Sequence, residues 1–211
     1  MQSILPMKDL NEALAEITAI RSQIARTAEF HGYGPVTVAI TGLMALVAGE
    51  IQAHKLNNPV HNIVAYIAIW MVTAALSLVL IGFEMVTRSR SMHSGLAEEM
   101  IANAVEQFLP AGVAGVLLTL VLVRFAPEAA WMLPGLWQVQ FSVGVFASAR
   151  FLPRATYAVG GWYLLTGLAC LALSHEQHTL SPWLMALPFG LGQMLGAAVL
   201  QWSESIEDGR F

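Results

Sequence analysis

Long apolar runs without a charged side chain dominate this sequence. Three of them, at 35–49, 63–83 and 156–173, contain no Asp, Glu, Lys or Arg. A helix needs about 20 apolar residues to cross roughly 30 Å of hydrocarbon, and in lipid it satisfies its own backbone hydrogen bonds. Barrel strands would instead alternate apolar and polar residues. The runs therefore predict transmembrane helices.

The composition agrees with this prediction. The chain has 211 residues, of which 56% are hydrophobic and 11% are charged, whereas soluble domains carry about 25% charged residues. The mean hydropathy is +0.62. Six spans would take more than half of the chain, which leaves no room for a second globular domain.

The predicted fold class is all-α: a polytopic membrane helix bundle of six transmembrane helices arranged as three hairpins, plus two amphipathic cytoplasmic helices. The spans are predicted at 35–53, 62–83, 109–125, 131–149, 156–173 and 182–202. The corresponding segments are an N-terminal amphipathic helix (1–34), hairpin 1 (35–83), a second amphipathic helix (84–108), hairpin 2 (109–149), hairpin 3 (150–202) and a tail (203–211).

Two polar segments carry apolar residues at helical spacing, which predicts amphipathic helices. Their polar faces mix acidic and basic residues, so anionic lipid is a poor target. The helices are expected either to pack on each other under the bundle or to dock a soluble cytoplasmic protein. The docking residues would be Leu10, Leu14, Ile17, Ile24, Leu96 and Met100.

Basic residues predict the orientation, because Lys and Arg collect in cytoplasmic loops. Six spans place Lys55 and Arg124 on one side and the other eight basic residues on the opposite side. We therefore predict a bacterial inner-membrane protein with cytoplasmic N- and C-termini. The scattered basic residues give no nucleic-acid footprint.

Polar side chains inside the spans are costly in lipid and often functional. Gln138, Gln193, Thr41 and Thr166 are candidates for a small ligand pocket, and Leu133-Pro134 with Gln138 resembles Leu187-Pro188 with Gln193. The alternative is hydrogen bonding between helices. No charged residue lies deep in a span, which counts against ion-coupled transport.

Histidines in the predicted outer loops are candidates for a metal site. Glu50, His54, His61, His175 and His178 would meet there if the two loops converge, and they would hold Zn²⁺ or Cu²⁺. No fixed metal-binding spacing is present, however, and histidine is also an ordinary loop residue. All histidines lie in loops or at span ends, which disfavours haem bound between two histidines inside the bundle.

Enzyme motifs are absent from the sequence. There is no Gly-x-Ser-x-Gly, no phosphate-binding Gly-rich loop with Lys, and no His-Glu-x-x-His. We predict a protein that is not an enzyme and has no cofactor beyond the possible metal. The small-residue pair Gly192 and Gly196 is compatible with bundle packing or with a homodimer.

Three stretches resemble a family of small bacterial six-helix inner-membrane proteins with no assigned activity. They are Leu-Ala-Glu-Ile-Thr-Ala-Ile-Arg at 14–21, His-Ser-Gly-Leu-Ala at 93–97 and Asn-Ala-Val-Glu-Gln-Phe-Leu-Pro-Ala-Gly at 103–112. Such proteins are similar to ones encoded next to small winged-helix regulators. The resemblance implies a membrane-bound partner for a transcription regulator.

The predicted function is a membrane sensor or scaffold. It would bind a small apolar ligand or sense the bilayer, and it would dock a soluble cytoplasmic partner through its amphipathic helices. The alternative is a metal-binding or small-solute transport protein that uses the outer histidines. A lipid-modifying enzyme with Glu50 and these histidines as acid and base ranks last, because no nucleophile is paired with them.

Overall fold

The computed structural model describes residues 34–55, 63–92, 95–149, 152, 154–175 and 180–207, and every regular element in these ranges is helical. The all-α prediction is confirmed for this part of the chain. The first predicted amphipathic helix, with Leu10, Leu14, Ile17 and Ile24, lies outside it. The elements are α2 (Pro35–Lys55), α3 (Ile63–Met92), α4 (Gly95–Phe125), the 3-10 helix η2 (Pro127–Met132), α5 (Leu133–Ser148), α6 (Thr156–Ser174) and α7 (Trp183–Glu207).

Five of these helices are long and apolar enough to cross a membrane: α2, α3, α4, α6 and α7. The span predicted at 131–149 is divided between the end of η2 and the 16 residues of α5. At about 1.5 Å per residue, α5 is roughly 24 Å long, which is shorter than the hydrocarbon thickness of about 30 Å. The sixth span therefore remains a prediction.

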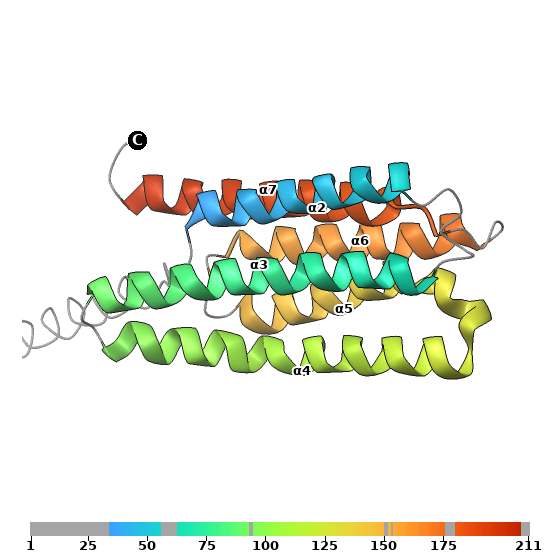
Figure 1. Cartoon of the computed structure of the whole chain (residues 1–211). Coiled ribbons are helices and arrows are strands. Elements are labelled where there is room, and N and C mark those ends of the chain that lie inside the picture. The colour runs from blue at the N-terminus through green and yellow to red at the C-terminus, as the bar shows by residue number, and fades with distance from the viewer. Residues whose placement is uncertain are drawn as a thin grey trace, which may run out of the picture.

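The helices run side by side along one axis (Figure 1). The paired helices of each predicted hairpin contact each other, and α4 packs extensively on α5, but the two most extensive contacts join different hairpins. α2 packs most extensively on α7, and α5 packs most extensively on α6, whereas α3 and α4 make few contacts with each other. Glycines allow the close approach of α2 and α7. A Cβ on Gly49 would overlap that of Ala186, and a Cβ on Gly42 would lie 2.9 Å from both the Cβ of Gln193 and the carbonyl oxygen of Gly190.

We call the end of the bundle with Lys55 and η2 the η2 end, and the opposite end the Met92 end. α3 and α4 project past α5 and α6 at the Met92 end (Figure 1). The segment 84–108 is therefore not a separate amphipathic helix. Its first part continues α3, because no Gly or Pro follows Phe83 before Met92, and the rest opens α4, which passes through Pro110 without ending.

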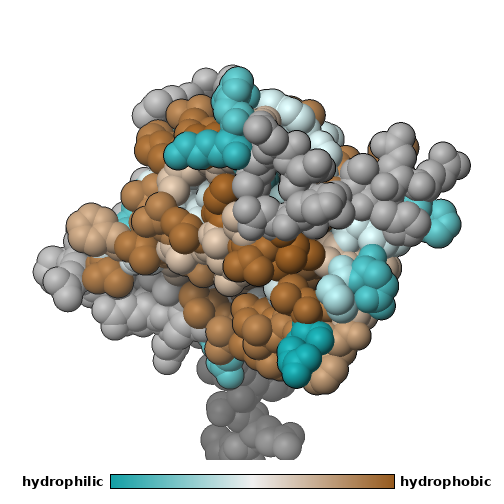
Figure 2. All heavy atoms as spheres, turned by 45° about the vertical axis from the view of Figure 1, so that its right-hand side comes forward, coloured by the Kyte–Doolittle hydropathy of each residue, from teal (hydrophilic) through white to brown (hydrophobic). Residues whose placement is uncertain are grey.

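Much of the described surface is apolar, as the visible face in Figure 2 shows. Val36, Ile40, Leu43, Val47 and Ile51 form one exposed stripe along α2. Only 11% of the apolar window of α3 and 17% of that of α4 are buried, so these two helices have the most surface to cover. Soluble monomers rarely expose apolar patches of more than a few hundred Å², so this surface is compatible with a membrane environment.

Candidate ligand pocket between the helices

A pocket of about 320 Å³ lies where α3 and α4 fail to pack against each other. Residues of α2, α5 and α7 form its remaining walls. This volume lies at the lower end of the range for small-molecule sites, which are mostly apolar with a few polar groups. Five aromatic residues contribute to the walls: Trp70, Phe108, Trp137, Phe141 and Phe189.

The aromatic walls are fixed by contacts between rings. Phe141 meets Phe108 edge-on at a centroid distance of 5.3 Å and Phe189 at 5.5 Å, which is a preferred geometry for aromatic pairs. Phe141 and Phe189 also contact Tyr163, which is buried. α4, α5, α6 and α7 are thereby joined beside the pocket.

The hydroxyl groups of the lining residues already donate their protons within the protein. Their oxygens can still accept a hydrogen bond, but they offer no free donor. The four bonds run from Thr41 to the carbonyl of Val38 (2.8 Å), from Thr73 to that of Ile69 (2.8 Å), from Ser77 to that of Thr73 (2.8 Å) and from Thr119 to that of Gly115 (2.7 Å).

The indole N–H groups of the two lining tryptophans also donate hydrogen bonds within the protein. The indole N–H of Trp137 donates to the hydroxyl oxygen of Thr119 at 2.8 Å, which ties α5 to α4. The indole N–H of Trp70 donates to the Oε1 atom of Gln52 at 2.9 Å. Gln52 is fully buried and also donates to the carbonyl of Tyr66 at 3.3 Å, which ties α2 to α3. Gln52, which lies near the end of α2, was not among the predicted pocket residues.

Two glutamine amides remain available to a ligand. Gln140 of α5 and Gln193 of α7 line the pocket and are half-buried, and within the described ranges neither side chain has a hydrogen-bond partner. Gln140 was not among the predicted pocket residues, although it follows Gln138 by two positions. Residues two apart on a helix lie about 200° apart around the axis, so only one of them can face a given pocket.

The structure therefore separates the four predicted pocket residues. Thr41 and Gln193 line the pocket, whereas Gln138 and Thr166 do not. Thr166 donates to the carbonyl of Trp162 at 2.8 Å in its own helix. Gln138 is fully buried, and its Nε2 atom donates to the carbonyls of Pro134 at 3.0 Å and Leu184 at 2.8 Å.

The bond from Gln138 to Leu184 has a specific cause. Proline has no backbone N–H, so Pro188 leaves the carbonyl four residues earlier in α7 without its helical donor. That carbonyl belongs to Leu184, and Gln138 replaces the missing donor from α5. Gln138 therefore holds two helices together, as in the alternative considered from the sequence.

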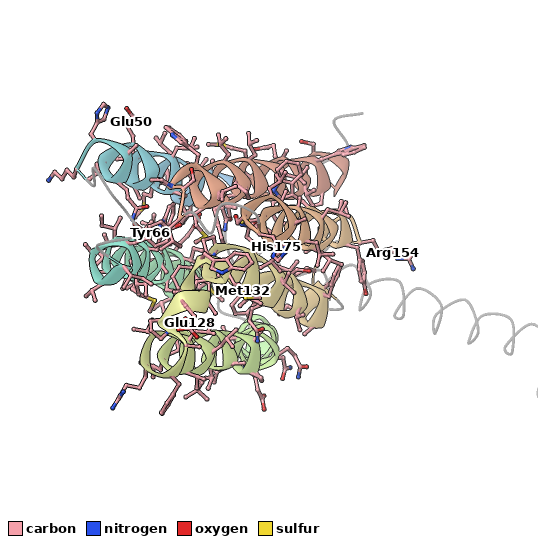
Figure 3. The ribbon with its side chains drawn as sticks, turned by 90° about the vertical axis from the view of Figure 1, so that its right-hand side faces the viewer. Glu50, Tyr66, Glu128, Met132, Arg154 and His175 are labelled. Atoms are coloured by element: carbon pink, nitrogen blue, oxygen red, sulfur yellow. The ribbon has the colours of Figure 1, made fainter. Side chains whose placement is uncertain are left out.

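The predicted metal residues do not converge where the structure describes them. His54 and Glu50 contact each other at 2.7 Å, and both side chains are exposed. Figure 3 shows Glu50 at the outer flank of α2, pointing away from the bundle, whereas His175 lies towards the middle of this end. Among the described residues no group of three potential ligands could hold a metal, and His61 and His178 lie outside them.

The predicted docking residues Leu96 and Met100 lie in the first two turns of α4. Known proteins add nothing to these observations: neither a family model, nor a curated protein, nor a solved structure matches the chain. The resemblance noted from the sequence therefore remains an expectation, and the geometry of the pocket carries the functional argument.

Proposed function

We propose that this chain is a multi-pass membrane protein that binds a small, mainly apolar ligand in the interhelical pocket and signals the bound state to a soluble partner. The observation that supports this proposal most directly is the position of the pocket. It lies between α3 and α4, which make few contacts with each other and which also extend past α5 and α6 at the Met92 end.

The distribution of charge supports the membrane location. No Asp, Glu, Lys or Arg occurs in 35–49, 63–83, 107–123, 133–148, 156–174 or 183–203, so every charged residue of the helices lies towards one of the two ends. The excess of Lys and Arg predicted on the side of the Met92 end makes that end cytoplasmic. With α5 as a sixth span, both termini lie in the cytoplasm of a bacterial inner membrane.

The coupling follows from the continuity of the two helices. α3 has 30 residues and α4 has 31, and each continues from the pocket to the Met92 end. A ligand placed between them changes their separation, and an α-helix carries that displacement along its length. The expected output is a movement of the start of α4, which contains Leu96 and Met100.

The partner is proposed to bind the Met92 end together with the N-terminal segment 1–34. The apolar stripe of that segment, Leu10, Leu14, Ile17 and Ile24, suits a helical docking surface. The resemblance to proteins encoded beside winged-helix regulators makes a transcription regulator the first candidate. If the chain binds such a regulator in a ligand-dependent way, it acts as a membrane sensor.

A filled pocket provides the first test. Gly112 lines the pocket, and a Cβ added there meets nothing within 4 Å. Gly112→Leu is therefore expected to reduce the space that a ligand can occupy. Gly161→Leu on α6 is the matched control, because it is equally open but lies outside the pocket. Mass spectrometry of organic extracts from the purified proteins should find a small apolar molecule with wild type and Gly161→Leu, but not with Gly112→Leu. Equal content in all three would remove the pocket from the proposal.

Partner docking is tested by affinity purification from membranes. The intact protein should recover a soluble protein that is lost when residues 1–30 are deleted. Gly112→Leu should change that recovery, whereas Gly161→Leu should not. Identical recovery from all four proteins would contradict a docking role linked to the pocket.

A further inference from the structure

We infer that the ligand is a neutral, ring-bearing lipid whose ring carries carbonyl oxygens, which is the chemical class of the isoprenoid quinones. The inference rests on the proposed function, because it names the ligand of the same pocket. Three properties of the pocket support it: the absence of charge, the inventory of free donors, and the opening on the flank of the bundle.

The absence of charge selects a neutral ligand. Every residue that lines the pocket is apolar, aromatic, Gly, Thr, Ser or Gln, and none is Asp, Glu, Lys, Arg or His. An ionised carboxylate or phosphate would be buried there without a counter-charge, which is strongly unfavourable. Fatty acid anions and phospholipid head groups are therefore poor ligands.

The free hydrogen-bonding groups select carbonyl oxygens. The lining hydroxyls of Thr41 and Thr119 and the lining indoles of Trp70 and Trp137 already donate within the protein. The only side-chain N–H groups of the described lining left to donate are the amides of Gln140 and Gln193. These two amides come from different helices, and each can donate to a ligand oxygen. A ring with two carbonyls matches this pair of donors.

The walls and the opening select a ring with a tail. Aromatic side chains prefer to meet other flat rings in offset or edge-on contact, and Phe108, Phe141 and Phe189 supply such faces. Met71, Leu78 and Val116 line the pocket yet remain 42%, 66% and 46% exposed on the flank. An alkyl or isoprenoid tail can therefore leave the pocket between α3 and α4 into the surrounding lipid.

The experiment compares two probes with the same tail: decylubiquinone and decylbenzene, whose ring has no carbonyl. Binding to the full-length protein in nanodiscs is measured as the rise in the unfolding midpoint, which increases with ligand affinity. The variant Gln140→Leu/Gln193→Leu removes both amides. Gln201→Leu is the matched control, because Gln201 lies on α7 outside the pocket.

Wild type and Gln201→Leu should bind decylubiquinone more tightly than decylbenzene. The double variant should lose about ten- to a hundredfold in quinone affinity, as expected for two lost hydrogen bonds, while its binding of decylbenzene stays unchanged. Equal binding of the two probes by wild type, or undiminished quinone binding by the double variant, overturns the inference but leaves an apolar pocket. If neither probe binds and Gly112→Leu changes nothing, the proposed function falls as well.

Discussion

Pro188 leaves one carbonyl of α7 without its usual donor, and Gln138 of α5 supplies the replacement. The Nε2 atom of Gln138 lies 2.8 Å from the carbonyl oxygen of Leu184, and the side chain is fully buried. In hydrocarbon no water can substitute for this donor. Trp162 and Tyr163 of α6 also donate to this part of α7, at the carbonyls of Pro188 (2.9 Å) and Phe189 (3.4 Å).

Gln138→Leu should therefore destabilise the protein by about 1–3 kcal/mol, the cost of leaving a buried carbonyl unpaired. In a Pro188→Ala background the residue at 188 regains its N–H, so the same change should cost less. The measurement is thermal unfolding followed by reaction of a fluorogenic thiol dye with Cys170, the only cysteine, which is buried in the folded protein.

The pair of variants forms a double-mutant cycle, which isolates the interaction between the two positions. Pro188→Ala alone measures how much the restored helical hydrogen bond changes the free energy of unfolding by itself. A loss from Gln138→Leu that is the same in both backgrounds would show that the glutamine does not serve the carbonyl freed by Pro188.

At the level of the elements, the contact between α2 and α7 depends on small residues. Without a hydrophobic driving force between helices in lipid, association relies on van der Waals packing and interhelical hydrogen bonds. Gly42 and Gly49 of α2 face Gly190 and Ala186 of α7 closely enough that an added Cβ has no room. The two helices therefore approach through their backbones.

Gly49→Leu should separate α2 from α7 and destabilise the protein by about 1–3 kcal/mol or more, the usual range for overpacking. Gly161→Leu should instead be neutral or slightly stabilising, because leucine is a better helix former by less than about 1 kcal/mol and its Cβ meets nothing. Unfolding midpoints of both variants against wild type test this. Similar losses in the two variants would indicate that the packing of α2 on α7 does not depend on this close approach.

The sequence predicted the positions of the helices well, but it did not predict the two most extensive contacts, between α2 and α7 and between α5 and α6. Three helix ends agree with the predicted spans: the start of α2 at Pro35, the start of α6 at Thr156 and the end of α4 at Phe125. They agree because a long apolar run is itself the feature that a membrane helix requires. The sequence gives no comparable indication of which helices pack against each other, because residues that face lipid and residues that face another helix are equally apolar. For the same reason Gln138 and Gln193 looked alike in the sequence, although one ties helices together and the other lines the pocket.

At the scale of the whole molecule, the number of crossings depends on α5. If its 16 residues complete a crossing, Glu128 in η2 and Arg154 before α6 must lie on opposite sides of the membrane. Both side chains are exposed. The six-span model places Glu128 outside and Arg154 in the cytoplasm.

Single cysteines at these positions test the crossing in a Cys170→Ser background. An impermeant maleimide added to intact spheroplasts should label Glu128→Cys, and it should label Arg154→Cys only after permeabilisation. Lys55→Cys and Thr87→Cys, which are both exposed, serve as outer and inner references. Labelling of Glu128→Cys and Arg154→Cys from the same side would mean that α5 does not cross and that the two termini face opposite compartments.

The pairing of α2 with α7 also has a consequence for biosynthesis. A ribosome delivers α2 before any other described helix and α7 after all of them. With the chain in the membrane as proposed, the glycine face of α2 has no α7 to pack against until residues 183–207 have been synthesised. A chain that terminates before Trp183 would therefore leave that glycine face permanently without its α7 contact.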